Sequence, residues 1–219
     1  MKHKKVAIFS ADMGRGGTQR VLATLSNYIS KHREVDLLLL KKEGHYLREI
    51  DRRVNLIDFD SSRSVFSLLK LIKYFNKRET GLFIASMEDL HFISAIAILL
   101  SKSDARAIYR LPSNPSYIYT EREHPTIYKK IQYKVLKLSL KFIYNLNFIE
   151  AIIVPSEKVK EDFLQHFSLN DLSKLKVVAN PIDTIQLDKV ESTEEVFFKN
   201  DYPIVLSMQR FELEKDNFT

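Results

Sequence analysis

The sequence has 219 residues, of which 45% are hydrophobic and 28% are charged, a balance that excludes a disordered chain and supports a folded core. It contains no cysteine, which excludes disulfide bonds, thiolate zinc sites and a cysteine nucleophile. The net charge of +6 allows phosphorylated substrates, an acidic membrane or nucleic acid as partners. At this length we expect one large domain, or one domain and part of a second.

The start of the chain and its apolar stretches predict neither a signal peptide nor a membrane span. Lysines precede the apolar run Val6–Ala11, but this run is too short for a signal peptide and ends at Asp12. The longest apolar stretch, Phe92–Leu100, is far shorter than the roughly 20 residues that a membrane-spanning helix needs. We therefore expect a cytoplasmic protein.

Seven short apolar runs predict strands, most of them buried on both faces of a parallel sheet. The segments between these runs are long enough for crossover helices. This alternation predicts an α/β fold with a doubly wound parallel sheet and right-handed crossovers. The predicted strands are Lys5–Ser10, Val35–Leu40, Val54–Phe59, Leu82–Ser86, Ala107–Arg110, Ala151–Val154 and Lys176–Ala179.

Helical patterns fill several of the segments between the strands. The clearest helix follows Thr18, which we expect to be its N-cap, and repeats apolar residues with the period of one helix face. Two more helices are predicted over Val65–Asn76 and Asp89–Leu100. Another is predicted to begin at the N-cap Ser156 and to end near Phe167.

The composition changes after the seventh predicted strand. Residues 184–202 contain clustered glutamates and no clear period, which indicates a linker. A further strand is predicted at Pro203–Met208. We therefore predict a first domain over residues 1–183, a linker over 184–202 and the start of a second domain over 203–219.

Two loops have residues that suit an anionic ligand. Gly16 and Gly17 lie between the first strand and its helix, where glycines allow close backbone approach and a helix N-terminus favours an anion. Their spacing matches neither the dinucleotide fingerprint nor the phosphate loop of nucleotide hydrolases, and a tight turn is the alternative. The loop after the strand at Pro203–Met208 contains Arg210 and Lys215, which could hold a phosphorylated group.

Ionisable residues after the fourth strand are candidates for proton transfer. A carboxylate or imidazole at Glu88 or His91 would lie at the ligand side of the sheet. For Asp89 we prefer a helix-capping role. The triplet Asp58–Asp60 resembles a metal–nucleotide motif, but it coincides with the end of a strand, and we predict no metal site.

The segment Thr126–Phe148 combines lysines and apolar residues and contains no acidic residue. It predicts a basic amphipathic helix that lies on an anionic membrane surface, or equally a surface helix with solvated lysines and its apolar residues in the core. No motif that reads RNA or DNA is present, so we predict no nucleic-acid partner. The lysines predicted to face a membrane are Lys129, Lys130, Lys134, Lys137 and Lys141.

Four short motifs follow one another along the chain. Gly16–Leu22 is similar to the sequence Gly-Gly-Ala-Glu-Arg-Val-Leu, and Val154–Leu164 is similar to Ser-x-x-x-Lys/Arg-x-x-Leu after a strand. Val177–Asp183 is similar to Val-Ile-x-Asn-Pro-Val-Asp. Leu206–Lys215 is similar to Gly-Arg-Leu-x-x-x-Lys, with Gln209 in the place of the glycine. In this order and spacing, the motifs resemble those of glycosyltransferase family 4.

The resemblance implies a GT-B fold with two Rossmann-like lobes, of which these residues form the N-terminal lobe and the first strand of the C-terminal lobe. In this family the N-terminal lobe mainly binds the acceptor, and the C-terminal lobe binds the nucleotide-sugar donor. Transfer retains the anomeric configuration and needs neither a metal nor a cofactor. The implied function is therefore sugar transfer to a glycan or lipid-linked acceptor in bacterial surface polysaccharide synthesis.

The resemblance also implies roles for particular residues. Gly16 and Gly17 would border the phosphates, and Arg210 and Lys215 would neutralise the diphosphate. The loop after the fifth strand departs from many relatives because it has no histidine. The residues implied on the acceptor side are Arg15, Ser113 and Asn114.

Most donor-lobe motifs of the family do not occur in these residues. We therefore expect little or no transfer by this chain alone. The alternative is a non-catalytic lobe that binds an acceptor or a lipid, or one subunit of a split transferase that needs a partner lobe. If the basic segment Thr126–Phe148 does lie on a membrane, we expect a cytoplasmic protein that binds peripherally at the inner face of the cell membrane.

Overall fold

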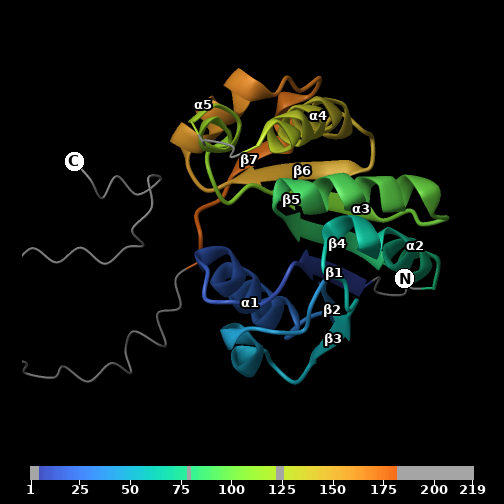
Figure 1. Cartoon of the computed structure of the whole chain (residues 1–219). Coiled ribbons are helices and arrows are strands. Elements are labelled where there is room, and N and C mark those ends of the chain that lie inside the picture. The colour runs from blue at the N-terminus through green and yellow to red at the C-terminus, as the bar shows by residue number, and fades with distance from the viewer. Residues whose placement is uncertain (1–4, 78–79, 122–125, 182–219) are drawn as a thin grey trace, which may run out of the picture. The chain divides into compact units, whose positions relative to one another are not determined.

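The structure is a computed structural model that describes residues 5–77, 80–121 and 126–181. Within these ranges, seven strands form one parallel sheet in the order β3-β2-β1-β4-β5-β6-β7 (Figure 1). All seven predicted strands up to residue 181 are confirmed, with ends shifted by at most a few residues. The strands are β1 Lys5–Ser10, β2 Val35–Leu39, β3 Val54–Asp58, β4 Thr80–Ser86, β5 Arg106–Arg110, β6 Ile149–Val154 and β7 Leu175–Val177.

The described ranges also contain α-helices at the places where the sequence predicts helices, and short turns precede two of them. A 3-10 turn, η2 Ser64–Ser67, precedes the second helix, and a π-helical turn, η3 Tyr117–Glu121, precedes the fourth. The α-helices are α1 Gly17–Ile29, α2 Leu68–Lys77, α3 Glu88–Leu100, α4 Ile127–Ile143 and α5 Glu157–His166.

The predicted helix starts have different outcomes. The N-cap of α1 is Gly16 and not Thr18, because Gly16 has an extended backbone and its carbonyl already accepts from the Arg20 N–H at 3.0 Å. The prediction for α5 is confirmed, since the Ser156 side chain accepts a hydrogen bond from the Val159 N–H at 3.3 Å.

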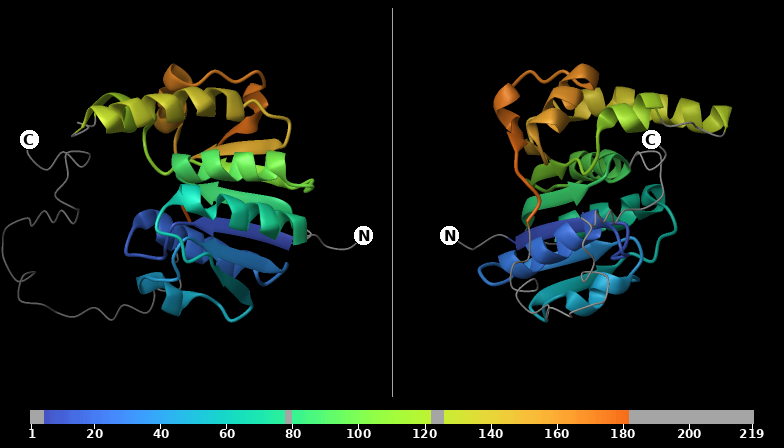
Figure 2. Two further views of the ribbon diagram at one scale, coloured as in Figure 1. Left: turned by 45° about the vertical axis from the view of Figure 1, so that its right-hand side comes forward. Right: turned by 90° about the vertical axis from the view of Figure 1, so that its left-hand side faces the viewer.

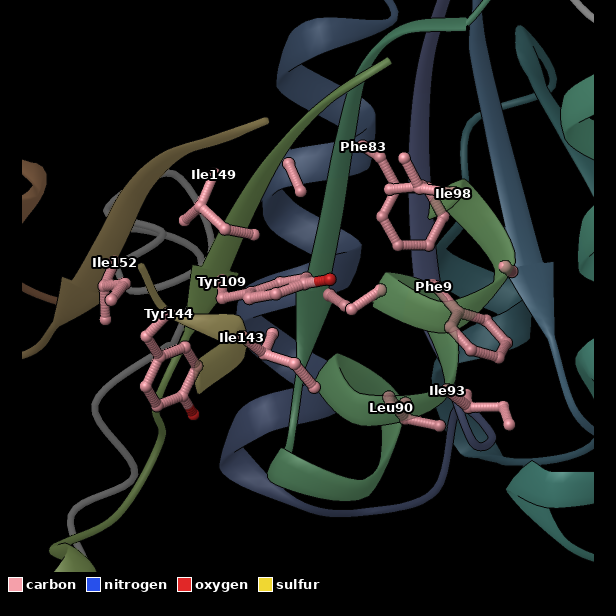
Figure 3. Packing of buried hydrophobic residues seen from close by; sticks show 14 of the residues in the cluster. Phe9, Phe83, Leu90, Ile93, Ile98, Tyr109, Ile143, Tyr144, Ile149 and Ile152 are labelled. Carbon is pink, nitrogen blue, oxygen red and sulfur yellow. The ribbon is translucent and has the colours of Figure 1, made fainter. Parts of the chain in front are cut away.

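Helices cover both faces of the sheet, with α1 on one face and α2, α3, α4 and α5 on the other (Figure 2). Alternate strand residues enter the two resulting cores, which is why most strand residues are apolar. In the larger core, the rings of Tyr109 and Tyr144 meet edge to face with centroids 6.3 Å apart (Figure 3). Phe9 and Phe83 pack nearby with centroids 6.1 Å apart.

The strand order reverses between β1 and β4. From β1 the chain proceeds through β2 to β3 at one edge, and from β4 it proceeds to β7 at the other. The loops that follow β1 and β4 therefore diverge at the carboxyl ends of the strands. Open α/β sheets bind ligands at such a switch point.

Several predictions concern residues beyond those described. The linker at 184–202, the strand at 203–208 and the phosphate-binding pair Arg210 and Lys215 lie outside the described residues. They stay predictions.

Candidate active site at the switch point

The loop after β1 is held by the loop after β2. The Met13 N–H donates to the Glu43 carbonyl at 2.9 Å, and the Tyr46 N–H donates to the Met13 carbonyl at 2.9 Å. Gly44 has φ 121°, and a Cβ at this position would lie 2.1 Å from the carbonyl carbon of Met13. Only glycine fits this close approach, so Gly44 supports the loop. A lone glycine after a strand gives no signal of this role in the sequence.

The predicted phosphate-binding glycines lie at the start of α1. Among the described residues no side chain caps this helix, and a Cβ on Gly17 would meet nothing within 4 Å. A Cβ on Gly16 would meet only the side chain of Gln19, which can move. Arg15 is exposed beside them. The N-terminus of α1 and the open space beside Gly17 suit an anion. The phosphate-binding role of Gly16 and Gly17 stays a prediction.

A strained corner connects β4 to α3. Met87 has φ 92°, which is rare for a residue with a side chain, and its carbonyl accepts from the Leu90 and His91 N–H groups at 3.1 and 3.0 Å. Such strain concentrates at functional sites. Here it turns the chain so that Glu88 stands in the first turn of α3 at the carboxyl edge of the sheet.

Glu88 is a buried carboxyl group with an unsatisfied oxygen. Its side chain is 8% exposed, and Oε1 has no hydrogen-bond partner in the described part of the chain. Burial, with a smaller contribution from the charge of Asp89, raises the pKa of Glu88 to about 7. A carboxyl group with this pKa exchanges its proton readily near neutral pH.

A pocket of about 320 Å³ opens beside Glu88, between the start of α3, the turn η3 and α4. Its carboxyl, amide and phenol groups can hydrogen-bond hydroxyl groups, and its apolar side chains can cover the face of a small ring. Burial and the nearby negative charge of Glu88 also raise the pKa of Tyr119, whose buried hydroxyl lacks a partner among the described residues. The pocket is lined by Met87, Glu88, Asp89, Ile118, Gln132, Tyr133 and Leu136.

His91, the second catalytic candidate, lies in the core and not in this pocket. Its Nδ1 is 3.1 Å from the Tyr144 hydroxyl, and its Nε2 is 3.1 Å from the Ala85 carbonyl. Its ring stacks on Tyr109 with centroids 4.4 Å apart. Burial lowers the pKa of His91 to about 3. A neutral imidazole with both nitrogens engaged stabilises the core, so we retain Glu88 alone as the catalytic candidate.

The acceptor-side loop residues lie at the same edge of the sheet. Ser113 and Asn114 follow β5 and are half-buried, and Pro115 beside them is buried. Ser116 anchors the loop to α5, since its N–H donates to Asp162 Oδ2 at 2.9 Å and its hydroxyl lies 2.8 Å from His166 Nε2. The structure therefore brings this loop and Glu88 to one edge, as the topology predicts.

Helix α4 exposes a row of apolar side chains. These residues recur every three or four positions and are 55–74% exposed, so they do not enter the core. Within the described residues, no helix is both long and apolar enough to cross a bilayer. The members of this row, called the α4 stripe below, are Ile127, Tyr128, Ile131, Val135, Leu138 and Phe142.

Four of the five predicted lysines of α4, at positions 129, 130, 134 and 141, are exposed. Lys137 is different, because its Nζ lies 2.7 Å from His166 Nδ1 and 5.3 Å from the centroid of the Tyr119 ring. Lys137 therefore joins α4 to α5, and its predicted orientation toward a membrane is not supported.

The triplet at Asp58–Asp60 forms a turn. Asp58 Oδ1 accepts from the N–H of Asp60 at 2.8 Å and from that of Lys42 at 3.3 Å. Across the described ranges, no three His, Cys, Asp or Glu side chains come close enough together to hold a metal ion.

Comparison with known proteins identifies the family. The model of glycosyltransferase family 4 matches residues 15–186. The chain belongs to glycosyltransferase family 4. It is 34% identical over 171 residues to the amylovoran biosynthesis glycosyltransferase AmsD of Erwinia amylovora, a match that covers 78% of this chain and 44% of AmsD. The chain thus spans less than half the length of this relative.

Solved structures of GT-B glycosyltransferases share the fold of this family 4 lobe. HepE of Anabaena, solved in complex with UDP-glucose, has a TM-score of 0.61 at 14% identity. The match covers 83% of this chain and 45% of HepE. A glycosyltransferase from Rickettsia africae has a TM-score of 0.61 at 13% identity. The match covers 89% of this chain and 47% of the Rickettsia chain. The fold is therefore that of an N-terminal GT-B lobe, as the sequence predicts.

Proposed function

We propose that the chain is the acceptor-binding lobe of a glycosyltransferase that acts in bacterial surface polysaccharide synthesis. The donor is a nucleotide sugar, and the acceptor is a glycan or a lipid-linked glycan. Membership of family 4 supports the reaction class. The AmsD relative is named for amylovoran biosynthesis, and HepE was solved with UDP-glucose, which supports a polysaccharide product and a nucleotide-sugar donor.

The pocket beside Glu88 is the observation that carries the proposal. It lies at the carboxyl edge of the sheet, and it combines a proton acceptor of pKa about 7 with polar and apolar lining that suits a sugar. In transfer, the bond from the sugar C1 to the donor diphosphate breaks, and a bond from C1 to the acceptor oxygen forms. Glu88 accepts the hydrogen bond of the acceptor hydroxyl and takes its proton.

The remaining features of the reaction follow the family pattern. Gly16 and Gly17 border the phosphates, and Arg210 and Lys215 neutralise the leaving diphosphate, whose developing charge is the main barrier. The anomeric configuration is retained, and neither metal nor cofactor takes part. Because the chain spans under half of the relative, we expect it to need a donor-binding lobe for turnover.

The α4 stripe supports a lipid-linked acceptor and peripheral membrane binding. Its exposed apolar residues adjoin Lys130, Lys134 and Lys141, a composition that suits the interface of an anionic bilayer. Gln132, Tyr133 and Leu136 of the same helix line the pocket. A lipid anchor in the bilayer would thus hold its sugar near Glu88. The same stripe favours the second candidate, a non-catalytic lipid-binding lobe of a split transferase.

Calorimetric titration tests the assignment of an acceptor lobe. We expect oligosaccharides and soluble prenyl-linked sugars to bind saturably, and nucleotide sugars to bind more weakly than these acceptors. Tyr133→Ala should weaken sugar binding at least fivefold because Tyr133 lines the pocket. Tyr28→Ala, on the exposed face of α1, is the matched control. Tight nucleotide binding with no sugar binding would contradict the proposal.

A further inference from the structure

Arg110 is a buried cation without an anionic partner among the described residues. It ends β5 and is 6% exposed. Its Nη2 donates to Asn180 Oδ1 at 2.6 Å, while Nη1 has no hydrogen-bond partner in the described part of the chain. Burial lowers the pKa of Arg110. An uncompensated buried charge is costly, so this arrangement needs an explanation.

Ser86 presents a second unsatisfied group beside Arg110. The two residues are paired in register at the carboxyl ends of β4 and β5, so their side chains point to the same face of the sheet. Ser86 is buried, and its Oγ also lacks a partner among the described residues. Two unsatisfied hydrogen-bond donors therefore stand together next to the switch point.

The guanidinium lies just below the surface of the described lobe. Its partner Asn180 is exposed, and the two side chains are in direct hydrogen-bond contact. The bond to Asn180 engages Nη2 and leaves Nη1 for another acceptor. A guanidinium with an unsatisfied N–H group and a hydroxyl donor nearby suits the oxygens of a phosphate.

We propose that Arg110 and Ser86 form a subsite for a phosphate group, with Asn180 as a positioning residue. The phosphate belongs either to the acceptor lipid or to the donor nucleotide, and both present the same oxygens to the subsite. The identification of this phosphate as part of a sugar-transfer substrate rests on the proposed function. The phosphate site itself does not, because it follows from the buried donors alone.

Binding of inorganic phosphate and diphosphate to the 219-residue chain tests the subsite without any transfer reaction. We expect saturable binding by calorimetry and a rise of Tm with either anion. Arg110→Gln should weaken binding at least tenfold. Arg110→Lys should weaken it less, because lysine keeps the positive charge but lacks the planar, paired N–H donors of the guanidinium. Ser86→Ala should weaken it by a few-fold.

Arg106→Gln is the matched control. Arg106 lies on the same strand, is exposed and pairs with Glu150 at 2.9 Å, so its loss should leave anion binding unchanged. Arg110→Met separates the subsite from a structural role. A subsite predicts that Arg110→Met keeps or raises Tm without phosphate and loses the phosphate response. A lower Tm with an unchanged phosphate response would overturn the proposal, as would wild-type protein that binds neither anion.

Uridine diphosphate and farnesyl phosphate identify the source of the phosphate. If the acceptor supplies it, farnesyl phosphate binds in an Arg110-dependent way; if the donor supplies it, uridine diphosphate does. Binding of inorganic phosphate that depends on Arg110 would stand even if the chain proved to have no part in sugar transfer. Binding of both ligands that is indifferent to Arg110→Gln would contradict the subsite and leave the proposed function intact.

Discussion

Glu88 should make stability depend on pH. Its pKa is about 7 in the folded chain against an ordinary value of 4.5, so its proton stabilises the fold below pH 4.5 and this contribution is lost as pH rises through 7. Glu88→Gln keeps the shape but cannot ionise. We expect its free energy of unfolding to exceed that of wild type by about 3 kcal/mol at pH 8, and by under about 1 kcal/mol at pH 5. Urea unfolding at both pH values measures this difference.

The matched control is Glu157→Gln. Glu157 is exposed in the first turn of α5 and pairs with Lys160 at 3.1 Å, so its loss should change stability by no more than about 0.5 kcal/mol at either pH. If Glu88→Gln and wild type differed by the same amount at pH 5 and pH 8, the carboxyl group would not be held neutral by burial.

At the scale of single elements, the α4 stripe should control membrane binding. Ile131→Ser with Leu138→Ser removes two exposed apolar side chains, so we expect binding to vesicles rich in anionic lipid to fall at least tenfold with little change in Tm. Lys130→Gln with Lys134→Gln should also weaken binding, and the effect should shrink at high salt. Co-sedimentation with vesicles at two salt concentrations measures both effects.

A control pair for the stripe lies at the end of α3. Leu99→Ser with Leu100→Ser removes exposed apolar side chains of similar size from another surface and should leave vesicle binding unchanged. Equal losses from both pairs would mean that general hydrophobicity, and not the stripe on α4, determines membrane binding.

The strands and helix α4 show which features of the fold the sequence predicts and which it does not. The apolar runs identified the strands because most strands are buried on both faces, which leaves a nearly continuous apolar pattern. Periodicity alone could not decide which face of α4 is buried, because Ile131 and Leu140 are equally apolar and only packing separates them. Periodicity could not predict the contact of Lys137 either, since its partner His166 lies on another helix.

The candidate site was harder to predict than the fold. Glu88 was identified from its place after a strand, but its burial depends on the backbone of Met87, and no glycine marks that strained corner. The walls of the pocket come from segments 30 to 48 positions after Glu88, such as Ile118 and Leu136, whose approach only the folded sheet determines. Arg110 and Ser86 looked like ordinary strand ends, because their missing partners are a property of the folded structure.

At the scale of the whole molecule, catalysis should require a second lobe. The described lobe contains the pocket and Glu88, while the donor side is proposed to begin near Arg210 and Lys215. We expect the 219-residue chain alone to transfer sugar at background rates. A fusion of residues 1–202 to the C-terminal lobe of a family 4 relative should transfer sugar measurably, with radiolabelled nucleotide sugar as the readout.

The fusion also separates binding from chemistry. In the same fusion, Glu88→Gln should keep the KM for acceptor within about threefold, because the amide still hydrogen-bonds a hydroxyl, while kcat falls about a hundredfold, since the proton acceptor is lost. The rise of kcat with pH through the pKa of Glu88, about 7, should disappear as well. An unchanged kcat in Glu88→Gln would assign proton transfer to another group, and full activity of the unfused chain would show that it already contains a working donor site.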